Sequence, residues 1–122
     1  MDMDVLQCRV WAVCGDMLNE EKFAVRIVRC LRRNNYTVFP VMSGEHENIY
    51  IDFDSMPEKP QVLVLCTRPD YGTEAVKEAI KAGIKHVWAQ PGARSDEIRQ
   101  ICEDNKVQYH EDCIMTKLTC GL

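Results

Sequence analysis

The chain has 122 residues, of which 46% are hydrophobic and 28% are charged, proportions that are ordinary for a globular protein with one domain. Its 15 basic and 19 acidic residues give a formal charge of -4, which argues against a protein that binds the phosphate backbone of nucleic acid through a basic face. The beginning lacks the basic residues of a signal peptide, and no apolar run approaches the length of a membrane span. We therefore expect a single domain over residues 1–122, with no nucleic acid and no membrane among its partners.

The first predicted elements are a strand and a helix. Residues 9–15 form a nearly continuous apolar run that stops at a glycine, which is typical of a strand buried on both faces. A helix is expected within residues 16–35, because apolar side chains fall on one stripe at 24, 27, 28 and 31. Asn19 is its expected N-cap.

Strands and helices continue to alternate after this pair. Gly83 is the expected carboxyl cap of the second long helix and Ser95 the expected N-cap of the third. The pattern predicts strands over 36–42, 61–67, 85–90 and 106–112, a short edge strand over 48–53, and helices over 69–83 and 95–105.

This alternation predicts an α/β fold, a Rossmann-like three-layer, doubly wound and mostly parallel sheet of about five strands. Ligands of such sheets bind outside the carboxyl ends of the strands, where the strand order reverses. The loops expected to carry function are therefore residues 15–22, 41–45, 66–70 and 90–94.

The seven cysteines give a separate indication about the compartment. No two of them have the CxxC spacing of zinc ribbons or thioredoxin-like motifs. Cys14, Cys66 and Cys102 lie inside apolar runs, where a thiol behaves as a small hydrophobic group. We expect a reducing compartment and hence a cytoplasmic protein.

The first loop is the expected anion site. Gly15 lets the chain turn into a helix whose amino end offers N–H groups to a phosphate. The further glycines of the dinucleotide fingerprint do not follow, since Met17 and Glu20 hold their positions. The acidic residue that grips the ribose of NAD is also absent after the second strand. An ordinary NAD site is disfavoured, and a plain strand-to-helix turn remains an alternative.

Five segments of the chain resemble a known family. They are "VWAVCG", "YTVFPV", "VLVLCTRPD", "VWAQPG" and "DCIMTKL". With them the sequence is similar, from Arg9 to Leu118, to the small stand-alone CoA-binding proteins, which are related to the CoA-binding domain of the succinyl-CoA synthetase alpha subunit. The most specific pieces are Trp88, Gln90 and Gly92, and the Cys-Ile-Met run at 113–115. The resemblance implies a Rossmann-like fold with coenzyme A bound across the strand ends.

The resemblance also implies which loops contact the ligand. By position, Gly15, Asp16 and Met17 occupy the turn around the diphosphate, and Lys22 matches a basic residue of the first helix. An apolar slot near Val41 and Cys66 is the expected place for the adenine. The other implied contacts are Met42 and Ser43 after the second strand, Thr67 and Arg68 after the central strand, and Gln90, Pro91 and Gly92 after the next one.

This chain departs from its relatives in the first loop. They typically have alanine and serine after the glycine and a proline a few residues on, where this chain has Asp16, Met17 and Glu20. Asp16 places a carboxylate where a diphosphate should sit, and two like charges a few Å apart cost about 1 kcal/mol even in water. Lys22 and Arg68 offset part of that repulsion. We expect binding to be weakened or lost through Asp16.

Several side chains admit both a structural and a functional interpretation. Trp88 is predicted to be a core residue, whereas Gln90 is predicted to line the ligand cleft. His46 and His86 are predicted on the surface. Cys113 lies near His110 and invites a nucleophile hypothesis, but packing of the tail is the preferred interpretation.

The sequence thus favours a CoA or acyl-CoA binding module with a nucleotide-type small-molecule ligand. No set of residues supplies a nucleophile, a base and an oxyanion site together, and no pair of histidines has metal-ligand spacing. The alternatives are an NAD-type oxidoreductase and a ligand-free interaction protein that keeps the fold. A homodimer is compatible with each.

Overall fold

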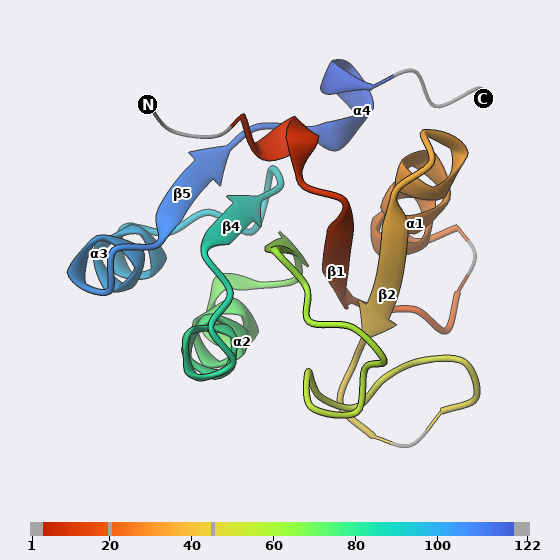
Figure 1. The fold of residues 1–122 in the computed structure, drawn as a ribbon, viewed down its shortest axis with the longest axis horizontal. Helices are drawn as coiled ribbons and strands as arrows, with labels where there is room; N and C mark the ends of the chain where they lie inside the picture. The colour runs from red at the N-terminus through yellow and green to blue at the C-terminus, as the bar shows by residue number, and fades with distance from the viewer. Residues whose placement is uncertain (1–3, 20, 45, 119–122) are drawn as a thin grey trace.

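The structure, a computed structural model, describes residues 4–19, 21–44 and 46–118. Its centre is a five-stranded, all-parallel sheet in the order β2-β1-β3-β4-β5 (Figure 1). The α/β Rossmann-like fold predicted from the sequence is confirmed. The elements in chain order are a 3-10 turn (Val5–Gln7), β1 (Val10–Gly15), α1 (Phe23–Arg33), β2 (Thr37–Val41), β3 (Val62–Cys66), α2 (Pro69–Lys81), β4 (His86–Ala89), α3 (Asp96–Asp104), β5 (Gln108–Glu111) and α4 (Ile114–Lys117).

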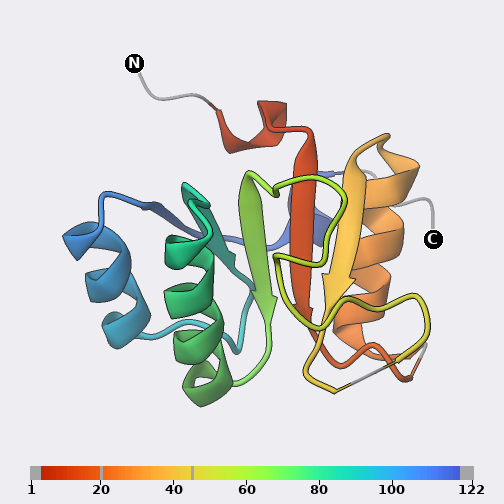
Figure 2. The ribbon, with the colours of Figure 1, turned by 60° about the horizontal axis from the view of Figure 1, so that its bottom comes forward.

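Helices cover both faces of the sheet. Helix α1 and the short α4 lie on one face, and α2 and α3 lie on the other (Figure 2). The strands are buried on both sides because their side chains alternate between two cores. Trp11 and Val13 enter the core beneath α1, whereas Ala12 and Leu63 enter the core beneath α2 and α3. This explains the continuous apolar runs in the sequence.

The strand order reverses between β1 and β3. The chain leaves β1 through α1 to reach β2 at the edge, and then crosses to β3 on the other side of β1. The residues at the carboxyl ends of these two strands lie side by side, with Gly15 in register with Cys66. Sheets of this kind bind ligands at such a reversal.

Two caps predicted from the sequence are confirmed, whereas the start of the first helix is not. The Ser95 hydroxyl accepts the N–H of Ile98 at 3.0 Å, and Gly83 has a φ of +85° just after α2. Helix α1 begins at Phe23, and Lys22 precedes it without a side-chain cap. Asn19 instead accepts the N–H of Glu21 at 2.9 Å, so its amide closes a turn in the loop ahead of the helix.

Two further expectations are wrong. Residues 48–53 form no strand, and an isolated bridge joins Tyr50 to Val41 at the edge of the sheet. Asn48 has a φ of 64°, which breaks the extended course of the chain. His86 is not on the surface but 6% exposed, because it opens a central strand and its Nδ1 lies 3.2 Å from Nε2 of His110.

The cysteines are not all in one state. Cys8, Cys14, Cys66, Cys102 and Cys113 are free thiols, whereas Cys30 is disulfide-bonded. Among the described residues, no helix is both long and apolar enough to cross a bilayer.

Candidate functional site

The loops at the carboxyl edge of the sheet enclose two neighbouring cavities. The first, here called the charged cavity, has a volume of about 480 Å³ and lies between the loops that follow β1, β3 and β4. The second, here called the apolar cavity, has a volume of about 270 Å³ and lies between the loop after β2 and helix α2. The charged cavity is lined by Asp16, Lys22, Phe23, Ala24, Cys66, Thr67, Arg68, Pro91, Gly92 and Ala93. The apolar cavity is lined by Cys14, Val41, Met42, Ser43, Ile51, Asp52, Phe53, Tyr71, Glu74, Ala75 and Glu78.

Gly15 follows Cys14, which lines the apolar cavity, and precedes Asp16, which lines the charged cavity. It lets α1 approach the sheet closely. A Cβ atom at this position would lie 2.7 Å from Cβ of Ala24 and 2.9 Å from the carbonyl oxygen of Cys66. Both neighbours are fixed parts of secondary structure, so neither could move without shifting an element. Glycine is needed here because of this close contact, and it places the amino end of α1 beside the end of β3.

The charged cavity contains two cationic and one anionic side chain. Arg68 forms two hydrogen bonds with Asp70, of 2.7 and 3.2 Å, and its guanidinium lies 5.4 Å from the ring of Tyr71. The hydrogen bond and the charge of Arg68 lower the pKa of the Asp70 carboxyl. The carboxylate of Asp16 accepts the N–H of Leu18 at 3.0 Å. Lys22 is exposed at the start of α1. With two cationic side chains against one carboxylate, the lining of the charged cavity suits a small anion better than an extended polyanion.

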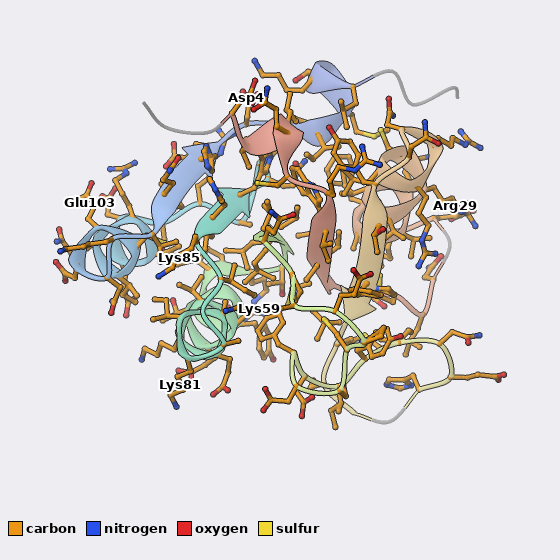
Figure 3. The ribbon with its side chains drawn as sticks, in the orientation of Figure 1. Asp4, Arg29, Lys59, Lys81, Lys85 and Glu103 are labelled. Carbon is orange, nitrogen blue, oxygen red and sulfur yellow. The ribbon has the colours of Figure 1, made fainter. Side chains whose placement is uncertain are left out.

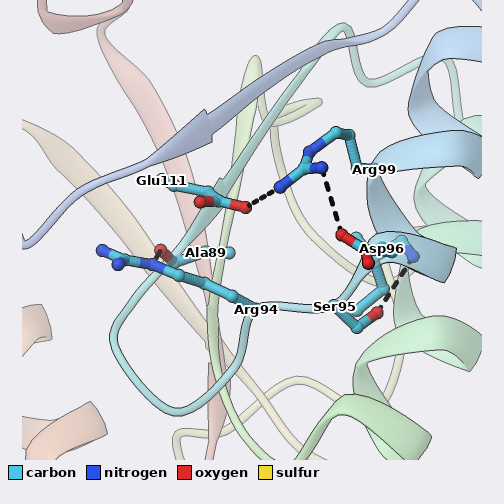
Figure 4. A network of polar contacts seen from close by, with 7 residues as sticks. Ala89, Arg94, Ser95, Asp96, Arg99 and Glu111 are labelled. Atoms are coloured by element: carbon cyan, nitrogen blue, oxygen red, sulfur yellow. Dashed lines mark hydrogen bonds and ion pairs between the residues drawn. The ribbon is translucent and has the colours of Figure 1, made fainter.

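A network of polar contacts holds the loop between β4 and α3 in place (Figure 4). Arg99 contacts Asp96 at 3.1 Å and Glu111 at 2.8 Å, which ties α3 to β5. The hydrogen bond from Arg99 and its charge lower the pKa of the Glu111 carboxyl. Arg94 donates to the carbonyl of Ala89 at 3.4 Å. The loop that supplies Pro91 and Gly92 to the cavity is therefore fixed at both of its ends.

Gln90 does not line either cavity, contrary to the sequence prediction. Its side chain is 0% exposed. Its Oε1 accepts the indole N–H of Trp88 at 2.9 Å and the backbone N–H of Ile114 at 2.8 Å, and its Nε2 lies 3.4 Å from Sγ of Cys113. The amide thus joins the end of β4 to the start of α4. The physical reason is that the chain's own tail supplies the partners that a ligand would otherwise have to provide.

Trp88 is a core residue, as the sequence predicts. It is 3% exposed, and its indole N–H also donates to the carbonyl of Asp112 at 3.0 Å. The proposed pairing of His110 with Cys113 is not formed: the His110 ring stacks on His86 and on Trp88, with centroid separations of 5.4 and 6.0 Å. Within the described residues, no group of three or more metal-binding side chains is found.

The structure brings most of the predicted site residues to one edge of the sheet. Val41, Met42 and Ser43 line the apolar cavity, and Gly15 contacts α1 and the end of β3. Met17 packs against the core beneath α1. The predicted residues that line the charged cavity are Asp16, Lys22, Cys66, Thr67, Arg68, Pro91 and Gly92.

Sequence reasoning missed one wall of the apolar cavity. Tyr71, Glu74, Ala75 and Glu78 lie on α2 and all face this cavity. Their spacing of i, i+3, i+4 and i+7 marks one helix face, and that spacing was the available signal. The large exposed hydrophobic side chains of the described residues also belong to this edge or its loops, namely Leu18, Phe23, Ile51 and Tyr71.

Comparisons with known proteins agree with the fold. A family model described as a CoA binding domain matches residues 9–119. A search of curated proteins finds no significant match.

Several solved structures are similar to this chain. A conserved hypothetical protein from Pyrococcus furiosus is 34% identical with a TM-score of 0.79, over 89% of this chain and 98% of that one. A hypothetical protein from Pyrococcus horikoshii OT3 is 25% identical with a TM-score of 0.82, over 92% of this chain and 82% of that one. A Thermus thermophilus protein that is 21% identical, with a TM-score of 0.79 over 92% of this chain and 88% of that one, shows likeness of fold alone.

Proposed function

This chain belongs to the CoA-binding domain family, and we propose that it binds CoA or an acyl-CoA without catalysing a reaction on it. The observation that carries the proposal is the pair of cavities at the reversal of strand order, one charged and one apolar. A nucleoside joined to a diphosphate needs one apolar and one charged cavity, since its base is apolar and its phosphates are charged.

The diphosphate belongs in the charged cavity. Lys22 and Arg68 are the cationic side chains that line either cavity. The N–H groups in the first turn of α1 have no partner within the helix, and they favour an anion at this end. The close contact at Gly15 keeps this turn beside the strand ends. Arg68 is held by Asp70, so it reaches a phosphate only by sharing or leaving that carboxylate.

The base belongs in the apolar cavity. Val41 and Phe53 supply aliphatic and aromatic surface, and Tyr71 supplies a second ring at its rim. The rest of the ligand, with its thiol or acyl group, would then extend along Pro91 and Gly92 on the far side of the charged cavity. In this placement the ligand crosses the carboxyl ends of β2, β1, β3 and β4 in turn.

Asp16 weakens binding of the diphosphate in this proposal. Its carboxylate lines the charged cavity and is exposed. The Asp16→Asn variant keeps an oxygen that can accept the N–H of Leu18 and removes the charge. We expect it to bind CoA about fivefold more tightly, because one like-charge contact costs about 1 kcal/mol in water.

Titration calorimetry with CoA, acetyl-CoA and NAD tests the proposal. Binding of CoA or acetyl-CoA tighter than NAD is expected, with the Asp16→Asn variant tighter than the wild type. Binding in the millimolar range or weaker to all three ligands, in both proteins, would overturn it. Selective binding of NAD would favour the oxidoreductase alternative. A cytoplasmic location and a homodimer stay predictions of the sequence.

A further inference from the structure

We propose that this site selects a nucleotide diphosphate whose ribose carries free hydroxyl groups, so that dephospho-CoA binds more tightly than CoA itself. This inference rests on the function proposed above and specifies the ligand. The two molecules differ only in the phosphate on the 3′-oxygen of the ribose. The carboxylates around the apolar cavity are the groups that discriminate between them.

The apolar cavity is bordered by negative charge alone. Asp52, Glu74 and Glu78 line it, and its lining contains neither lysine nor arginine. Asp52 comes from the loop after β2, and the two glutamates lie one turn apart on α2. These three acidic residues therefore border the cavity from two sides. An anionic group placed there would face three like charges.

Neighbouring lysines reduce this field without reversing it. Lys77 lies 3.7 Å from Glu74, and Lys81 lies 3.8 Å from Glu78. These lysine side chains are 52% and 77% exposed, and Figure 3 shows Lys81 on the outer side of α2. Exposed pairs of this kind are weak, and they cancel a glutamate's charge at best. Asp52 takes part in no ion pair of the described residues.

The loop after β2 contributes no positive charge to the site. Residues 42–58 contain no lysine or arginine, but they contain Glu45, Glu47, Asp52, Asp54 and Glu58. The next basic residue is Lys59, whose side chain approaches Gly83 just beyond the end of α2. It lines a different cavity at the opposite edge of the sheet, together with Gln61 and Lys85. Lys59 is therefore not available to a phosphate at the ligand's ribose.

The position of the ribose follows from the two ends of the ligand. With the diphosphate beside Lys22 and the base beside Val41 and Phe53, the sugar lies between the cavities, at the border of the apolar one. A phosphate monoester there adds between one and two negative charges near pH 7. Free hydroxyl groups instead donate hydrogen bonds to carboxylates, which accept them well. The same carboxylates thus repel one ligand and bind the other.

Titration calorimetry with dephospho-CoA and CoA as a matched pair tests the inference. At low ionic strength we expect dephospho-CoA to bind at least about tenfold more tightly, and this ratio should fall as added salt screens the carboxylates. The double variant Asp52→Asn, Glu74→Gln should reduce the ratio to about threefold or less, because two of the three charges are gone. The variant Glu103→Gln, on α3 far from the cavities (Figure 3), should leave the ratio unchanged.

Each alternative outcome is distinct. Equal affinities for the two ligands, or tighter binding of CoA, would overturn the selectivity and leave the proposed function standing. A ratio that survives in the double variant would show that other groups discriminate, which also overturns the inference. Absence of binding for both ligands would overturn the proposed function and this inference with it. Circular dichroism of the variants, whose substitutions lie on the exposed rim, confirms that they are folded.

Discussion

Replacing Gln90 separates a structural from a ligand-binding role for the residue at the end of β4. In the Gln90→Leu variant the side chain keeps a similar size and loses its polar atoms. The N–H of Ile114 then loses the acceptor that it has at 2.8 Å. The indole N–H of Trp88 retains one partner, the carbonyl of Asp112 at 3.0 Å. The buried connection between β4 and α4 would therefore be broken at one donor and weakened at another.

The expected cost follows from these contacts. A buried donor left without a partner costs about 1–3 kcal/mol, and the loss of a second, shared hydrogen bond costs about 0.5–1.5 kcal/mol. The additional apolar surface of leucine offsets part of this sum. We expect a net loss of about 2–3 kcal/mol in the free energy of unfolding. For a chain of this size about 4 °C of melting temperature corresponds to 1 kcal/mol, so the melting temperature should fall by about 8–12 °C.

Thermal unfolding followed by circular dichroism, with and without CoA, is the assay. The matched control is Gln100→Leu, which changes the same residue type on the exposed face of α3 and should alter the free energy of unfolding by about 0.5 kcal/mol or less. Affinity for CoA, measured well below the melting temperature, should be unchanged in both variants. An unaltered melting temperature together with lost CoA binding in Gln90→Leu would refute the structural role of Gln90.

Three further outcomes are expected. Gly15→Ala should destabilise the protein by about 1–3 kcal/mol in urea unfolding and weaken CoA binding, because its Cβ would overlap Ala24 and the Cys66 carbonyl; unchanged values would contradict the close contact. Burial, and then the charge of His86, lower the pKa of His110 below its usual 6.5, so the unfolded chain binds a proton more readily. Stability should therefore fall as pH drops below about 6.5, and His110→Gln should flatten that loss; an equal loss in the variant would count against it. Burial raises the pKa of Cys14 to about 11, so alkylation at pH 8 should be about 100-fold slower than for an exposed thiol and should speed up in urea; rapid labelling of the native protein would disprove this.

Most of the fold could be predicted from the sequence, because the signals for it are local. The continuous apolar runs at β1 and β3 require burial on two faces, and this requirement alone favours a parallel sheet with helices on both sides. Ser95 caps its helix through a hydroxyl three residues from its partner. An asparagine side chain can cap a helix or close a turn, and the sequence pattern does not distinguish the two. Asn19 accepts a hydrogen bond from the backbone of its own turn and does not cap the helix.

The candidate site could be predicted less well, because it depends on which distant segments meet. The loops that follow the strands were identified, since the carboxyl ends of parallel strands share one edge. The apolar cavity needs residues from α2 and from the loop at 51–53 to face each other. No short-range sequence pattern specifies that these two segments lie on opposite sides of one cavity. In the sequence, Glu74 and Glu78 look like part of an ordinary solvated helix face. Only the structure shows that they line the apolar cavity.

Contacts between distant segments also explain why Gln90 is buried whereas Pro91 and Gly92 line the charged cavity. A polar amide at the end of a buried strand must find partners, and both a ligand and the rest of the chain can provide them. The deciding groups are the N–H of Ile114 and the sulfur of Cys113, more than twenty residues further along. Once the amide is bound to the tail, the turn that follows it is fixed, and Pro91 and Gly92 are left to face the charged cavity. The buried amide therefore has a structural role, since it joins the end of β4 to the start of α4, and it is not itself a contact of the proposed ligand.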